Sequence, residues 1–118
     1  MEEICPVSGT TIIATGCMVS VCIPIARLYG TGLVNARTFK PLDDGMLERV
    51  RAGAERILVV EECTECLGSR VAALMPDRKV IRLHIPDRPV RQGTVEQQRK
   101  ACGISPEDIA RAVRGEDG

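Results

Sequence analysis

The clearest strand of this chain reads RILVVEE at residues 56–62, and the four residues 57–60 are apolar without a break. A strand with one face in water alternates polar and apolar residues, whereas a strand covered on both faces is continuously apolar. We therefore predict a strand over residues 56–61, inside a sheet that helices cover on both faces.

Outward from this strand, strand-like and helix-like patterns alternate along the chain. Such alternation is typical of βαβ units and predicts a three-layer α/β/α fold with a mostly parallel sheet. Further strands are predicted at 10–14, 32–38 and 79–84, and helices at 18–29, from 43 or 44 to about 54, at 67–75, from 94 and from 105.

The first and last of these helices carry strong local signals. Pro24 lies inside the helix at 18–29. Proline removes a backbone donor and collides with the preceding turn, so we expect a kink or a late helix start. In the last helix, Ser105 stands where a capping residue is favoured, and Pro106 follows at the first helical position.

Length and charge limit the function classes. The 118 residues suit one domain, and we assign residues 1–8 to a leader and residues 115–118 to a frayed tail. Lysine plus arginine number 16, as do aspartate plus glutamate, so the formal net charge is +0. A neutral chain has no overall field that attracts nucleic acid or an anionic membrane. We expect neither partner.

The beginning of the chain, MEEICP at residues 1–6, lacks the basic and then apolar order of a secretory signal. No apolar stretch approaches the ~20 residues that span a bilayer. We therefore expect a cytoplasmic protein, in which the six cysteines stay reduced and mostly pack as small apolar residues.

Four of the cysteines permit a different interpretation. Cys63 and Cys66 form a C-x2-C pair between a predicted strand and a predicted helix, a placement that lowers thiol pKa values in redox sites. Cys17 and Cys22 follow the first parallel strand, and the carboxyl ends of parallel strands share one edge of a sheet. The four thiols would then supply a zinc site. A free-standing redox or metal-binding module therefore remains an alternative to cysteines that only pack in turns and helices.

Five short segments, in a fixed order, carry a resemblance to a known family. They read TIIATG (11–16), NARTFKPLD (35–43), VVEE (59–62), IPD (85–87) and QGT (92–94). In this order they resemble the C-terminal domain of the transketolase family of thiamin-diphosphate enzymes, most closely its 1-deoxy-D-xylulose-5-phosphate synthase branch. A transketolase section and a 2-oxoacid dehydrogenase beta-subunit domain are the alternatives.

The resemblance implies a supporting role and no catalytic residue in this chain. In the family, thiamin diphosphate and magnesium are held by a Gly-Asp-Gly motif and a distant asparagine, and a separate pyrimidine-binding domain activates the cofactor. These 118 residues contain no Gly-Asp-Gly. The expected partners are therefore the cofactor-binding and pyrimidine-binding domains, on the same or a separate chain, within a homo-oligomer such as a dimer.

Charged residues at two strand ends are the candidates for contact with those domains. Glu61 ends the predicted strand at 56–61 and Glu62 follows it, while Asp87, Arg88 and Arg91 lie in the turn-rich loop at 86–94. Local alternatives are a hydrogen bond from Glu61 or Glu62 to a neighbouring loop, and a solvated loop in which Asp87 makes a turn bond.

Overall fold

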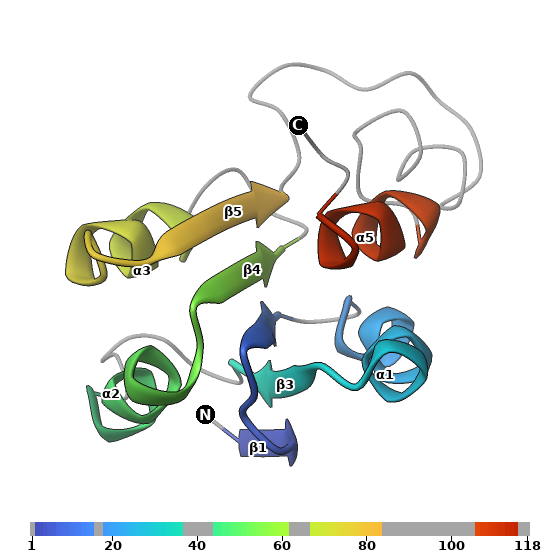
Figure 1. The fold of residues 1–118 in the computed structure, drawn as a ribbon, viewed down its shortest axis with the longest axis horizontal. Helices are drawn as coiled ribbons and strands as arrows, with labels where there is room; N and C mark the ends of the chain where they lie inside the picture. The colour runs from blue at the N-terminus through green and yellow to red at the C-terminus, as the bar shows by residue number, and fades with distance from the viewer. Residues whose placement is uncertain (1, 16–17, 37–43, 62–66, 84–105, 116–118) are drawn as a thin grey trace.

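The computed structural model describes residues 2–15, 18–36, 44–61, 67–83 and 106–115. These residues form a five-stranded sheet with helices on both faces (Figure 1). Its strand order is β1-β3-β2-β4-β5, with β1 antiparallel to β3 and the other neighbours parallel. The strands are β1 (Glu2–Cys5), β2 (Thr10–Ala14), β3 (Gly32–Asn35), β4 (Arg56–Val60) and β5 (Lys79–Leu83); the helices are α1 (Met18–Tyr29), α2 (Asp44–Gly53), α3 (Gly68–Leu74) and α5 (Pro106–Val113).

The connections explain the three layers. From β2 the chain passes through α1 to β3, and from β3 it returns through α2, past β2, to β4. Crossovers between parallel strands are right-handed in nearly all proteins, so connections that run in opposite directions place their helices on opposite faces. Accordingly α1 and α5 cover one face of the sheet, and α2 and α3 cover the other.

Strand alternation divides the core into two clusters, one under each pair of helices. Leu58 and Val60 of β4 pack with α1 and α5, while Ile57 and Val59 pack with α2 and α3. All four side chains are fully buried. The prediction of a strand covered on both faces is thus confirmed, together with the three-layer α/β/α fold.

The structure of helix α1 excludes one of the two outcomes that its proline predicts. The late start is wrong, because the helix begins at Met18 and continues past Pro24 to Tyr29. Pro24 is exposed, whereas Met18, Cys22, Ile25 and Ala26 are buried. Tertiary packing supplies most of the stability of short helices, and here it outweighs the cost of about 3 kcal/mol that an interior proline carries.

The first residues of the chain contain a strand that the sequence analysis missed. The sequence predicts a leader at residues 1–8, but Glu2–Cys5 pair with β3 as an antiparallel edge strand. The Glu3 carboxylate accepts a hydrogen bond from the Val7 backbone N–H at 2.8 Å and pairs with Arg49 at 2.8 Å. The four residues of β1 begin with two glutamates and show no alternation of polar and apolar side chains. Their pairing with the free edge of β3 therefore explains why they form a strand.

Two further expectations concern the ends of elements. The helix from residue 94 falls outside the described residues. The strand predicted at 32–38 ends earlier, at Asn35, with Ala36 outside it and residues 37–38 not described. Helix α5 begins at Pro106 with Glu107 and Asp108 in its first turn. None of the helices in the described ranges has the length and hydrophobicity that a membrane crossing requires.

Candidate functional site

The carboxyl ends of β2 and β4 lie side by side in the middle of the sheet. Ala14 pairs with Val60, and the Thr15 N–H donates to the Val60 carbonyl oxygen at 3.1 Å. From β2 the chain continues to α1 on one face, and from β4 it continues to α3 on the other. In open α/β sheets, binding sites form where neighbouring strands lead to opposite faces. Glu61 directly follows β4 at this position.

Glu61 is fully buried and joins three elements. Its Oε1 accepts a hydrogen bond from the Leu67 N–H at 3.0 Å, and its Oε2 accepts one from the Gly68 N–H at 2.7 Å. Its own N–H donates to the Leu83 carbonyl oxygen of β5 at 3.0 Å. A carboxylate suits the first amides of a helix, because they have no partner within the helix and carry its positive dipole end. The side chain therefore connects the end of β4 to the start of α3.

Gly68 is the residue that allows this contact. A Cβ at position 68 would lie 2.9 Å from Cγ and Cδ of Arg82 and 3.1 Å from Oε2 of Glu61. The methylene groups of Arg82, on β5, thus pack directly against the amide that Glu61 binds. Because any larger residue would displace Arg82 or the carboxylate, the glycine fixes where α3 begins relative to β4 and β5.

Glu61 and Cys22 are the only candidate site residues that fall within the described part of the chain. Glu61 makes the local hydrogen bonds described above; contact with another domain stays a prediction. Glu62, Asp87, Arg88 and Arg91 lie outside the described residues, as do Cys17, Cys63 and Cys66.

Cys22 lies on the buried side of α1 and belongs to the core cluster on that face of the sheet. Loss of solvation raises the pKa of its thiol to about 12. The thiolate is the form that attacks electrophiles and binds metals, and this environment disfavours it. Within the described residues, no group of three or more His, Cys, Asp or Glu side chains could hold a metal ion.

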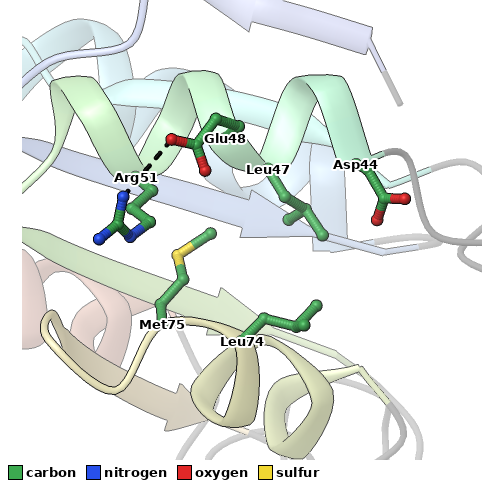
Figure 2. A pocket seen from close by; sticks show the side chains of 6 residues that line it. All are labelled: Asp44, Leu47, Glu48, Arg51, Leu74 and Met75. Carbon is green, nitrogen blue, oxygen red and sulfur yellow. Dashed lines mark hydrogen bonds and ion pairs between the residues drawn. The ribbon is translucent and has the colours of Figure 1, made fainter.

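Between α2 and α3 the structure contains a hollow of about 160 Å³ that the sequence analysis did not predict (Figure 2). We call it the α2–α3 groove. Its apolar lining comes from Leu47 on α2 and from Leu74 and Met75 at the end of α3, and its charged lining from Asp44, Glu48 and Arg51. Leu47 and Met75 are buried, but Leu74 is 51% exposed. The sequence did contain a signal for this groove. Val71, Leu74 and Met75 form an apolar face at the end of α3 that is wider than packing against the sheet alone requires.

One known protein family matches almost the whole chain. A family model described as the C-terminal domain of transketolase matches residues 2–109. The chain belongs to this transketolase C-terminal domain family. This confirms the resemblance inferred from the five segments.

Curated relatives of this transketolase-type chain are 1-deoxy-D-xylulose-5-phosphate synthases. The protein from Cytophaga hutchinsonii is 41% identical over 90 residues, covering 70% of this chain and 14% of that enzyme. The protein from Syntrophus aciditrophicus is 34% identical over 126 aligned positions, covering 96% of this chain and 19% of that enzyme. The chain thus spans less than a fifth of these relatives and is homologous to one region of them.

Two solved structures share the fold. One, titled as a split-gene transketolase in the form of an inactive beta4 tetramer, matches with a TM-score of 0.85 at 20% identity, covering 97% of this chain and 41% of that chain. The other is transketolase from Campylobacter jejuni, with a TM-score of 0.64 at 16% identity, covering 92% of this chain and 17% of that chain. At such identities the match concerns the fold.

Proposed function

We propose that this chain is a non-catalytic, assembly-supporting part of a thiamin-diphosphate-dependent transferase of the 1-deoxy-D-xylulose-5-phosphate synthase type. The supporting observation is the family match over residues 2–109, combined with relatives of which the chain spans only 14% to 19%. The reaction would join pyruvate to glyceraldehyde 3-phosphate in the cytoplasm, with its catalytic groups on domains outside these residues.

The described residues of this chain do not fit the cofactor itself. The sequence contains no Gly-Asp-Gly, and the described residues offer no cluster of metal-binding side chains. Magnesium needs several oxygen ligands in near-octahedral arrangement. We therefore assign thiamin diphosphate and magnesium to the partner domains.

The supporting role would be to hold neighbouring domains in one orientation. Catalysis between groups on different domains depends on their placement to within a fraction of an ångström. The buried sheet and the link from Glu61 to α3 give this chain a fixed carboxyl edge. The proposed contact residues at that edge are Glu62, Asp87, Arg88 and Arg91, while Glu61, which is fully buried, would hold the edge from within. The solved split-gene neighbour, an inactive tetramer by its title, favours partners on separate chains and a homo-oligomeric assembly.

The test compares the chain alone with the chain plus its partners. Calorimetry with thiamin diphosphate and magnesium, and an assay with pyruvate and glyceraldehyde 3-phosphate, should give neither binding nor turnover for the purified chain. Adding chains that carry the cofactor-binding and pyrimidine-binding domains, taken from adjacent reading frames, should restore both. Turnover by the chain alone would overturn the proposal. Activity only on ketose phosphates would assign the complex to transketolase.

A further inference from the structure

Exposed apolar surface in the described part of the chain is concentrated at two places. The large apolar side chains exposed there are Leu28 at 76%, Tyr29 at 37% and Leu74 at 51%. Leu28 and Tyr29 end α1, whereas Leu74 ends α3 and lines the α2–α3 groove. Because α1 and α3 lie on opposite faces of the sheet, Leu28 cannot reach the groove of its own molecule.

The end of α1 combines an apolar tip with positive charge, and we call residues 27–29 the α1 knob. Arg27 is exposed and forms no ion pair with any described residue. Arg114 donates a hydrogen bond to the Tyr29 hydroxyl at 2.9 Å and lies over its ring at 5.9 Å. Leu28 is therefore an exposed apolar side chain that follows an exposed arginine in the sequence and precedes a tyrosine held by Arg114.

The α2–α3 groove offers the opposite chemistry. Figure 2 shows Leu74 and Met75 reaching from α3 toward α2, with Leu47 facing them, Asp44 on one side of Leu47 and Glu48, paired with Arg51, on the other. Asp44 forms no ion pair within the described residues. The one cation of the lining, Arg51, is shared between Asp77 outside the groove at 2.6 Å and Glu48 of the lining at 3.4 Å. Asp44 is thus the rim carboxylate that no described cation pairs with, beside an apolar floor.

Size also matches. The hollow of about 160 Å³ is close to the engineered apolar cavity of about 150 Å³ that accepts benzene. A single branched aliphatic side chain fits such a space. The most exposed large apolar side chain of the described residues, Leu28, is of this kind.

We propose that the α2–α3 groove of one copy receives the α1 knob of a second copy, with Leu28 against Leu47 and Leu74, and Arg27 facing Asp44. Since knob and groove are different surfaces on opposite faces, the contact is head-to-tail and leaves one free knob and one free groove on each pair. One anchor residue is small beside the roughly 1,000 Å² that a stable interface buries. The association is therefore weak, and it does not depend on the proposed function.

Sedimentation velocity of the whole chain under reducing conditions tests this contact. Between micromolar and millimolar protein, the mean sedimentation coefficient should rise, and the rise should weaken with salt. Leu28→Asp and Leu74→Asp should each weaken association about tenfold or more. Ala73→Asp places the same charge on α3 outside the groove lining and should associate like the unmodified chain.

Mixing the two variants separates this geometry from a symmetric dimer. Leu28→Asp keeps its groove and Leu74→Asp keeps its knob, so the mixture should form dimers and nothing larger, while each variant alone stays monomeric. Arg27→Glu should weaken association, and mixing it with Asp44→Arg should restore it, which provides a second route if an apolar variant misfolds. A monomer at every concentration, or association unchanged by these variants, would overturn the proposal and leave the groove to a different partner.

Discussion

Glu61 holds together the end of one strand and the start of the next helix. A carboxylate without exposure to water is costly unless its oxygens are hydrogen-bonded. Here one oxygen accepts the N–H of Leu67, the residue before α3, and the other accepts the N–H of Gly68, the first residue of α3. Hydrogen bonds to a charged group contribute about 1.5–3 kcal/mol each, more than neutral ones. The residue is therefore a stability determinant independently of any contact with another domain.

Replacing Glu61 should destabilise the chain in a graded way. Glu61→Ala leaves the amides of Leu67 and Gly68 without acceptors and opens a void, so we expect a loss of about 2–4 kcal/mol in the free energy of unfolding. Glu61→Gln keeps one acceptor oxygen and should cost about half of that. Urea unfolding of the two variants measures the difference. An alanine variant within about 0.5 kcal/mol of the unmodified chain would contradict this account.

Cys22 predicts how stability depends on pH. Its folded pKa of about 12 exceeds the ordinary value of 9.0, so between these values the folded chain binds a proton that the unfolded chain releases. The thiol's contribution is complete below pH 9 and is lost as pH rises toward 12, by at most about 1.4 kcal/mol per pH unit.

The measurement is urea unfolding at pH 8, 9 and 10 for the unmodified chain and for Cys22→Ala. All other ionisable groups are the same in both proteins, so the difference between the two slopes isolates the thiol. The alanine variant should lose less stability as pH rises. Parallel slopes would show that Cys22 is accessible to water.

At the scale of elements, local signals sufficed for most helices and parallel strands. The bounds of β2 and α1 follow from β-branched and apolar patterns, and α5 begins at Pro106 as its N-terminal signals predict. What no local pattern contains is contact between distant segments. Strand β1 depends on the edge of β3, and the two bonds of Glu61 depend on the path that returns the chain to α3. The α2–α3 groove likewise exists only once both helices pack on one face.

Arg56 is another such long-range link, and it anchors α5. From the first position of β4, its guanidinium donates to the carbonyl oxygens of Val113 at 3.2 Å and Ala112 at 2.8 Å. Carbonyls at a helix end have no partner within the helix and carry its negative dipole end. We expect Arg56→Ala to cost about 1–3 kcal/mol.

Hydrogen exchange measures which helix loses stability in the Arg56→Ala variant. The amides of α5 should exchange faster in Arg56→Ala while those of α2 and α3 change little, because α5 lies on the other face of the sheet. Arg56→Lys keeps the charge but cannot donate from two nitrogens at once, so it should fall between the alanine variant and the unmodified chain. Equal effects on all helices would point to general destabilisation of β4.

At the scale of the whole molecule, β1 ends the sheet beyond β3. A parallel sheet buried on both faces still exposes unpaired backbone groups at its edge strands, and such edges template association with other chains. Strand β1 satisfies the outer edge of β3 in antiparallel register, interrupted by an irregularity between Glu3 and Cys5. Glutamates at its start and an irregular register are both devices that discourage a further strand from adding.

Removing residues 1–5 should therefore affect stability and solubility together. The deletion frees the outer edge of β3 and uncovers the part of the core against which Ile4 and Cys5 pack. We expect a loss of about 3 kcal/mol in the free energy of unfolding, with aggregation detected by light scattering at concentrations where the full chain shows none. Deleting residues 116–118 is the control and should change neither quantity. If the deletion at the beginning of the chain were equally silent, β1 would contribute nothing to the sheet, and the head-to-tail contact would be the surface to examine for any self-association of this chain.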